Sequence, residues 1–407
     1  MPRAGQVKSP LGERLSDRIA VGLLTSTFPP ELVDRVVAEA GRTQQRSRLL
    51  PARVVVYYVL AMCLFFGQGY EEVARLLTEG LGWARRWQGS WQVPTTAAIT
   101  RARAKLGPEP VKALFAAACR PVATAQTVGG FYRRWRLVAV DGTTFDLPDT
   151  SANVDFFGRP GSGRGSGAYP QARVAALAEC GTHAIFAAAT GPLATGETVL
   201  ARRLFGALSP GMLLLADRGF HSFDLWQQAA ATGTDLLWRV RSAAVLPVIE
   251  QLDDGSYLSH IYAARDRRRT DPITVRVIEY TLPGNGTVYR LITTILDPDA
   301  APALDLAALY TQRWEIETSF DELKTHQGRP GMVLRSQTPA GVEQEIYGFL
   351  LVHYAIRHLM HQAATTTGID PDRVSFTRTL RLVRRQVTAQ AAFSPLTIDP
   401  GPAPGHP

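Results

Sequence analysis

The sequence has little cysteine, little lysine and no long apolar segment. Its three cysteines, Cys63, Cys119 and Cys180, are too few and too widely spaced for a disulfide framework or a paired-cysteine zinc site. Such cysteine use is typical of a reducing compartment, so we expect a cytoplasmic protein. The longest apolar run, residues 54–66, is well short of the roughly 20 residues that a membrane-spanning helix needs. It predicts a buried helix, and the N-terminus shows no secretory signal.

The rest of the composition is that of a folded protein. The chain has 407 residues, of which 45% are hydrophobic and 20% charged, so it can bury a sizeable core and is expected to form two or three domains. Only four of its 44 basic residues are lysines. Because alanine, glycine and proline are also abundant, the excess of arginine is consistent with a GC-rich genome and is weak evidence for function.

The charge is distributed unevenly along the chain. Residues 1–140 carry 20 basic and 9 acidic side chains, whereas residues 141–330 carry 17 basic and 22 acidic ones. The remaining residues are close to neutral, and the whole chain has a formal charge of +8. This pattern excludes a uniformly basic, histone-like binder. It favours one region that holds a polyanion and another that concentrates carboxylates, as a metal-dependent site does.

Residues 1–130 are predicted to form a helical N-terminal domain, because apolar residues recur there at spacings of three and four. One predicted helix, residues 97–106, carries Arg101, Arg103 and Lys105 and ends before Gly107 and Pro108. These three side chains are candidates for contacts with DNA phosphates. A solvated basic face in a helical bundle explains them about equally well, since no base-reading signature accompanies them.

From about residue 131 the pattern changes to strands. Two short apolar runs, residues 137–140 and 212–216, are typical of central strands buried on both faces, and each is followed by an aspartate, Asp141 or Asp217. Further strands are predicted at 172–178, 183–189 and 235–240, and helices at 197–208 and 223–231. This order predicts an α/β domain with a mixed sheet.

The remaining segments complete the predicted domain organisation. Residues 241–300 are β-rich, with a hairpin whose strands are 274–280 and 288–295. We therefore predict a catalytic domain over 131–330 with a β-rich insertion at about 241–300, C-terminal helices over 331–394, and a disordered tail over 395–407.

Strand-end aspartates are candidates for a site, since open α/β sheets place functional residues at the carboxyl ends of strands. Taken singly, either aspartate is more often a turn former or a helix cap. A predicted helix over 304–327 adds a third element. At about 100° per residue, its residues Tyr310, Arg313, Glu317 and Lys324 fall within an arc of about 60° beside an apolar stripe.

This constellation resembles the DDE transposases of bacterial insertion sequences, of the insertion sequence 4 type. Their helix signature is Tyr, two residues, Arg, three residues, Glu, six residues and Lys, and Tyr310, Arg313, Glu317 and Lys324 match every spacing. The segments at 140–144 and 215–220 resemble the two aspartate blocks of that family. The resemblance extends from about residue 12 to residue 390.

The resemblance implies a ribonuclease H-like fold in which Asp141, Asp217 and Glu317 form the catalytic site. It implies double-stranded DNA as the partner, at transposon ends and target sites, with a dimer or higher assembly on that DNA. Tyr310, Arg313, Trp314, Lys324 and Arg218 are then candidate DNA contacts, with phosphates for the polar groups and an unpaired base for the indole. Asp321 is a rival carboxylate on the same helix, whereas Glu315 and Glu322 point elsewhere.

Three carboxylates so close together require cations. At about 5 Å and an effective dielectric of about 20, each pair would repel by roughly 3 kcal/mol. Oxygen ligands suit Mg²⁺ or Mn²⁺, and two ions can stabilise the attacking and leaving oxygens of a phosphodiester displacement. The sequence leaves two alternatives open: a nuclease of the same fold that does not join ends, and a non-catalytic DNA-binding protein.

Overall fold

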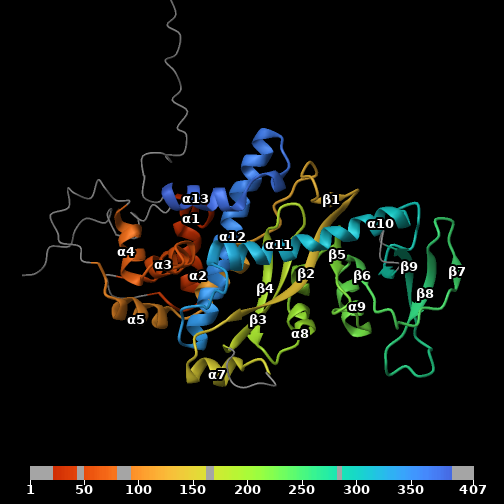
Figure 1. Ribbon diagram of the computed structural model, residues 1–407, viewed down its shortest axis with the longest axis horizontal. Helices are drawn as coiled ribbons and strands as arrows, with labels where there is room; N and C mark the ends of the chain where they lie inside the picture. Colours follow the sequence, from red (N-terminus) through yellow and green to blue (C-terminus); the bar gives the residue numbers. More distant parts are fainter. Residues whose placement is uncertain (1–21, 44–49, 80–92, 162–168, 282–286, 387–407) are drawn as a thin grey trace, which may run out of the picture.

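The structure is a computed structural model that describes residues 22–43, 50–79, 93–161, 169–281 and 287–386 (Figure 1). The predicted tail, residues 395–407, lies outside these residues. No helix among them is long and apolar enough to span a membrane. Cys63, Cys119 and Cys180 are all buried and unpaired, as the prediction of a chain without a disulfide framework requires.

The N-terminal part is helical, as the apolar periodicity predicts. Its helices are α1 (Gly22–Thr27), α2 (Pro30–Glu39), α3 (Ala52–Leu64), α4 (Tyr70–Glu79), α5 (Thr96–Leu106) and α6 (Glu109–Ala118). Local signals set their ends: the Thr95 side chain accepts a hydrogen bond from Ala98 N at the start of α5, and Gly107, with a φ of 70°, ends that helix. Helix α3 is buried along nearly its whole length, which confirms the buried helix predicted from residues 54–66.

The centre of the molecule is a mixed sheet. In the described residues its strands are β1 (Phe131–Tyr132), β2 (Trp135–Asp146), β3 (Gln171–Glu179), β4 (Ile185–Pro192), β5 (Met212–Ala216), β6 (Asp235–Arg239), β7 (Glu250–Gln251), β8 (Tyr257–Ile261), β9 (Ile273–Thr281) and β10 (Val288–Thr293). The order across the sheet is β4-β3-β2-β5-β6-β10-β9-β8-β7, with β1 paired to β2. Strands β2, β5 and β6 are parallel, and the other pairs are antiparallel. The β-rich insertion therefore extends the central sheet through the pairing of β10 with β6.

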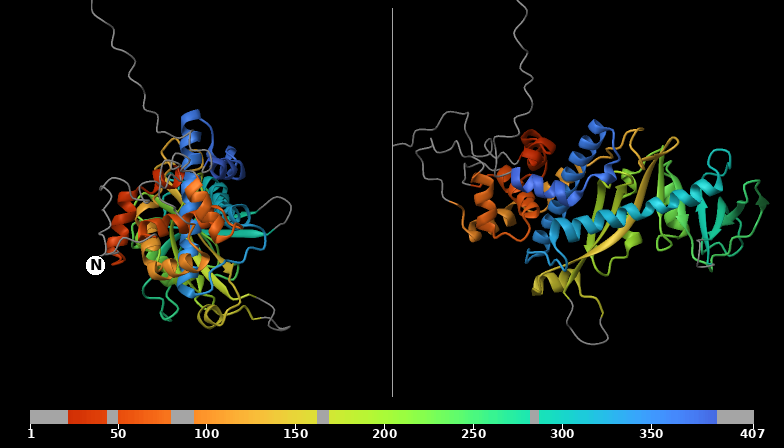
Figure 2. Two further views of the ribbon diagram at one scale, coloured as in Figure 1. Left: turned by 90° about the vertical axis from the view of Figure 1, so that its left-hand side faces the viewer. Right: turned by 45° about the horizontal axis from the view of Figure 1, so that its top comes forward.

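Helices cover both faces of the sheet (Figures 1 and 2). Alternate residues of β2 enter different cores: Leu137 and Ala139 belong to one, Val138 and Val140 to the other. The second core is closed by α8 (Glu197–Arg202) and α9 (Phe223–Ala230). The first is closed by a helical line over Ala303–Gly328 and by α12 (Pro339–Thr367). Helix α7 (Ser151–Phe157) follows β2.

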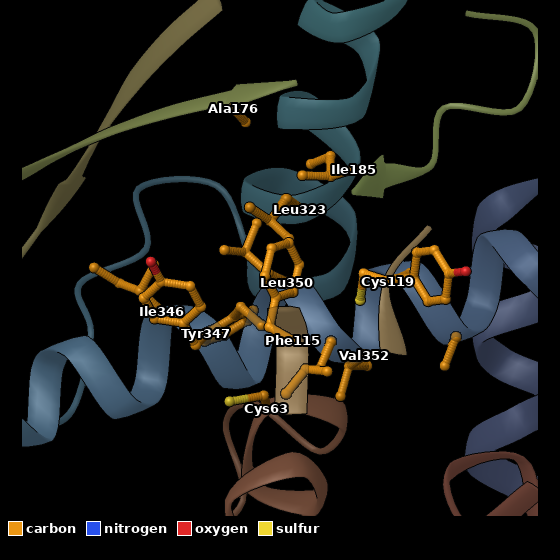
Figure 3. Packing of buried hydrophobic residues seen from close by; sticks show 14 of the residues in the cluster. Cys63, Phe115, Cys119, Ala176, Ile185, Leu323, Ile346, Tyr347, Leu350 and Val352 are labelled. Carbon is orange, nitrogen blue, oxygen red and sulfur yellow. The ribbon is translucent and has the colours of Figure 1, made fainter. Parts of the chain in front are cut away.

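Helix α12 joins the N-terminal helices to the sheet. It packs against α3, α6 and β4, and Figure 3 shows Leu350 and Val352 among side chains from both parts. At Gly348 a Cβ atom would lie 2.8 Å from Cys63 Sγ, so the glycine permits the close approach of α12 and α3. Helix α13 (Phe376–Gln386) packs on the outer side of α12. The N-terminal helices, one face of the sheet and the C-terminal helices thus share one continuous core.

Three predicted elements differ from the structure. The strand expected over 137–140 continues to Asp146, because β2 stays paired with β3 over its whole second half, so Asp141 and Gly142 are strand residues. The helix expected over 197–208 stops at Arg202 and is followed by a 3₁₀ turn. The helix expected over 304–327 is a helical line whose winding changes: α10 (Ala303–Leu309), a 3₁₀ segment (Tyr310–Arg313), α11 (Trp314–Asp321) and a π-helical segment (Glu322–Gly328).

Candidate active site

Asp141 and Asp217 lie next to each other where the pairing of β2 with β5 ends. The last parallel pair is Val140 with Ala216; Asp141 is the next residue of β2, and Asp217 directly follows β5. Both strands reach this point through apolar side chains that are buried on the two faces of the sheet. The two carboxylates therefore lie just beyond the last paired residues of β2 and β5.

Burial affects the two carboxylates differently. Burial raises the pKa of Asp141 to about 6, and the neighbouring Glu317 and Glu197 add to this, against the opposing effects of the Gly142 backbone N–H and Arg313. Asp217 has one carboxylate oxygen, Oδ1, that is buried and accepts no hydrogen bond. Its nearest cation, the Arg239 guanidinium, is 3.9 Å away. Such an orphaned acceptor is costly unless a ligand satisfies it.

The helical line from α10 to the π-helical segment crosses the sheet over this point (Figure 1). The Tyr310 hydroxyl donates to the backbone carbonyl of Ala216 at 3.2 Å and is buried. Tyr310 therefore fixes the line to the end of β5, directly before Asp217. The hydroxyl that the sequence offered as a phosphate contact is engaged with the protein instead.

Arg313 connects the strand carboxylate to the helix carboxylate. Its guanidinium donates to Glu317 Oε1 at 2.9 Å and lies 3.6 Å from Asp141 Oδ2. Arg313 is 5% exposed, and its Nε atom has no hydrogen-bond partner. Asp141 and Glu317 thus lie beside the same cation. The Glu317 side chain is 41% exposed and so is accessible to solvent.

Lys324, the last signature residue, lies close to Asp141 on β2. Lys324 donates to the Thr143 hydroxyl at 3.3 Å, two residues beyond Asp141 on β2. The π-helical segment that carries Lys324 has a wider turn than an α-helix, and such segments are frequent at functional sites. Trp314 is 57% exposed, and the Arg313 guanidinium lies 4.7 Å from the centre of its ring. Asp321, the rival carboxylate, is exposed and pairs with His326 at 3.3 Å, away from the two aspartates.

The basic residues of α5 do not form one surface. Arg101 and Lys105 are exposed, but Arg103 is 7% exposed and donates to Gln344 Oε1 at 2.8 Å and to Ser336 Oγ at 2.9 Å. The expectation that Arg103 contacts DNA is corrected, because its guanidinium fastens α5 to α12. Arg218, which follows Asp217, is exposed as a DNA contact requires.

A second group of charged residues lies further along the helical line. Glu322 accepts hydrogen bonds from Arg357 and bonds to His353 at 3.1 Å. Despite the opposing effect of burial, His183, His353 and Arg357 hold the pKa of Glu322 well below its usual range. The expectation that Glu315 and Glu322 point away from the site is in agreement with this arrangement, since Glu315 pairs with His183.

This second group contains the most compact set of potential metal ligands in the described residues: atoms of His183, Glu315 and Asp372 lie within 4.8 Å of one another. Asp141, Asp217 and Glu317 do not form so compact a set in the described residues: Asp141 and Glu317 lie beside Arg313, and Asp217 lies 3.9 Å from Arg239. The two ring nitrogens of His183 already have protein partners, Nε2 with Glu315 and Nδ1 with Arg357.

Glu197 is a further carboxylate near Asp141, and no pattern in the sequence identifies it as a site residue. Glu197 begins α8, and a Cβ atom at Gly142 would lie 2.8 Å from its Cδ atom. An acidic residue in the first turn of a helix is ordinary, so the sequence gives no reason to single it out.

Comparisons with known families decide the identity. The profile described as "Transposase DDE domain" matches residues 134–355, which is more than half of the chain, and "Insertion element 4 transposase N-terminal" matches residues 18–116. The chain belongs to the DDE transposase family. The resemblance inferred from the helix signature is confirmed, and so are the predicted fold class and enzyme class.

Two transposases of Escherichia coli agree with this assignment. The transposase InsG for insertion sequence element IS4 of Escherichia coli is 29% identical over 90% of this chain and 83% of its own length. The putative transposase InsZ of the same organism is 25% identical over 53% of this chain and 70% of its own length. The solved piggyBac transposase synaptic complex with hairpin DNA aligns with a TM-score of 0.48 and 11% identity, over 90% of this chain and 80% of that one.

DDE transposases act with divalent metal ions, and the transposase has residues that fit such an ion. The candidate donors are all carboxylate oxygens, which hard cations prefer. Asp217 Oδ1 is buried without a hydrogen bond, and Asp141 is a carboxyl whose pKa is raised by burial. Both features indicate negative charge that the protein itself leaves uncompensated.

Proposed function

We propose that Asp141, Asp217 and Glu317 are the catalytic carboxylates of this DNA transposase. The observation that carries the proposal is the register of β2 and β5, which puts the two aspartates side by side while Arg313 joins Asp141 to Glu317. The three would hold two Mg²⁺ or Mn²⁺ ions. When bound, such ions polarise the phosphate and lower the pKa of an attacking water or hydroxyl group.

The reaction is hydrolysis at the end of an insertion sequence, followed by attack of the freed 3′-hydroxyl on target DNA. InsG is named for an insertion sequence element, which supports element ends as the DNA that is cut. The side chains of the protein supply position and charge. Tyr310 fixes the helical line to the end of β5, and the apolar strands hold both aspartates rigidly.

The cations around the carboxylates are placed to bind phosphates. Lys324 donates one hydrogen bond to the Thr143 side chain, and Arg218 is exposed next to Asp217 in the sequence. Trp314 presents an exposed ring for stacking on a base. Arg313 is buried, so we assign it first to orienting Asp141 and Glu317.

The N-terminal helices are proposed to hold double-stranded DNA away from the cut. Arg101 and Lys105 are exposed on α5, in the part of the chain with the largest excess of basic residues. A dimer or higher assembly on two element ends completes the proposal.

The deciding experiment incubates the purified transposase with labelled element ends, target DNA and Mg²⁺. We expect cleaved ends and joined products, and neither when a chelator removes the metal. Cleaved ends without joined products would show a nuclease. Binding without either product, at every divalent ion tried, would show a non-catalytic DNA-binding protein.

A further inference from the structure

Glu197 lies against the backbone of the active-site strand. It is the first residue of α8, which follows β4 and packs on β2, β3 and β4. A Cβ atom placed on Gly142 would lie 2.8 Å from both Cγ and Cδ of Glu197 and 3.1 Å from its Oε1. The side chain of Glu197 therefore occupies the space that any larger residue at position 142 would need. Position 142 directly follows Asp141.

The cation beside Glu197 pairs with it only weakly. Arg173 Nη1 is 3.9 Å from Glu197 Oε1, beyond hydrogen-bond distance, and Arg173 Nε is buried without a hydrogen bond. A half-exposed pair at this distance contributes little. The carboxylate of Glu197 instead lies against Gly142, the residue that follows Asp141 on β2. A further carboxylate this close to Asp141 adds negative charge to the proposed cation site.

We propose that Glu197 is a fourth carboxylate of the active site, whose charge beside Asp141 strengthens the binding of a divalent ion there. Glu197 is a positioning and electrostatic residue in this proposal and acts through Asp141. Gly142 has a matching role: the absence of a side chain lets Glu197 reach the strand. The inference rests on the proposed function, because it assumes that Asp141 holds the ion.

The test measures Mn²⁺ binding to the full-length protein without DNA, by electron paramagnetic resonance of the free ion. Glu197→Gln should weaken Mn²⁺ binding about tenfold, in the range found when residues that support metal ligands are removed. Gly142→Ala should do the same with Glu197 intact, because the new methyl group displaces its carboxylate. DNA cleavage by both variants should recover when the Mn²⁺ concentration is raised by about the same factor.

Glu109→Gln is the matched control. Glu109 also lies in the first turn of a helix, α6, pairs with an arginine at 3.5 Å, and sits against a glycine, Gly107. It is part of the N-terminal helices and not of the sheet that holds the carboxylates. Its substitution removes the same charge and should leave Mn²⁺ binding unchanged.

Two results would overturn the inference. Unchanged Mn²⁺ binding in Glu197→Gln, with binding lost in Asp141→Asn, would leave the proposed site intact and remove Glu197 from it. Weaker binding in Gly142→Ala alone would likewise show that Glu197 is not responsible. Unchanged binding in Asp141→Asn as well would contradict the proposed function itself.

Discussion

Two groups of charged residues lie on the same helical line, five residues apart, and they are built in opposite ways. Around Glu317 the carboxylates are partly exposed, Asp141 and Glu317 share Arg313, and Asp217 Oδ1 has no hydrogen bond. Around Glu322 the carboxylate is 6% exposed and bonds to Arg357 and His353. The same residue types thus form two kinds of group. The carboxylates around Glu317 are incompletely paired, and we call them the open group. The Glu322 carboxylate is fully paired, and we call Glu322 and its partners the closed group.

The difference separates function from stability. A buried carboxylate that is fully paired holds elements together, and removing it leaves its partners with uncompensated charge. A carboxylate that burial leaves poorly paired lowers the stability of the empty protein but is ready for a cation. The comparison predicts that substitutions in the two groups have opposite effects on activity and stability.

The largest expected effect is on DNA cleavage. Asp141→Asn, Asp217→Asn or Glu317→Gln should each reduce cleavage by about 10³-fold or more, because each removes a carboxylate that would hold the ions acting on the phosphate. Binding to element ends should remain nearly intact. Single-turnover cleavage and a gel-shift assay on the same preparations measure both, and full activity in any variant would remove that residue from the site.

The next effect is on stability. Glu322→Gln should lower the free energy of unfolding by about 3–5 kcal/mol, because it leaves the buried Arg357 without its carboxylate. Glu317→Gln, on the same helical line, is the comparison and should lower it clearly less, because Glu317 is half-exposed and Arg313 keeps Asp141 as a neighbour. Denaturant unfolding measures both. Equal losses in the two variants would erase the distinction between the groups.

The closed group also gives a pH dependence. The folded-state pKa of Glu322 is lowered, so its contribution is fully present above its unfolded pKa of about 4.5 and is lost as pH falls below that value. Unfolding free energies should therefore decline more steeply between about pH 5 and pH 3 in the wild type than in Glu322→Gln. Parallel curves for the two proteins would show that Glu322 is not strongly paired.

A smaller change of opposite sign is expected in the open group. The pKa of Asp141 is raised to about 6 in the folded state, so its ionisation costs stability as pH rises from about 4 to 6 and the cost is complete above that. Asp141→Asn should therefore stabilise the metal-free protein at pH 7, by about 1–3 kcal/mol. Thermal unfolding in chelator measures this, and a destabilised variant would contradict the account.

The smallest effect is expected on DNA affinity, at the exposed basic residues proposed to contact phosphates. Lys324→Ala should remove one phosphate contact, and so reduce the slope of log affinity for DNA against log salt concentration by about 0.9. Arg101→Ala should act similarly. Arg103→Ala, on the same helix as Arg101, should instead destabilise the protein, because Arg103 is bonded to Gln344 and Ser336. Similar salt slopes in all three variants and the wild type would remove these lysine and arginine assignments.

Much of the site follows from local patterns in the sequence. The apolar runs before Asp141 and Asp217 predict central strands, and the spacing of Arg313 and Glu317 predicts one helix edge. The structure places Arg313 between Asp141 and Glu317, as a shared edge requires. These features depend on residues close in the chain, and periodicity reports on such residues well.

Other features depend on distant partners. Arg103 has the exposed-face spacing of Arg101, yet its partners at 336, 341 and 344 bury it. The continuation of β2 beyond Asp141 depends on pairing with β3. The approach of Glu197 to Gly142 depends on how α8 packs on the sheet. No local pattern predicts such contacts.

The most direct test of the account is an anomalous-difference map from crystals of the transposase soaked in Mn²⁺. The account predicts density among the carboxylates of Asp141, Asp217 and Glu317, which disappears in Asp217→Asn. Density instead at His183, Glu315 and Asp372, with none beside Asp141, would contradict it.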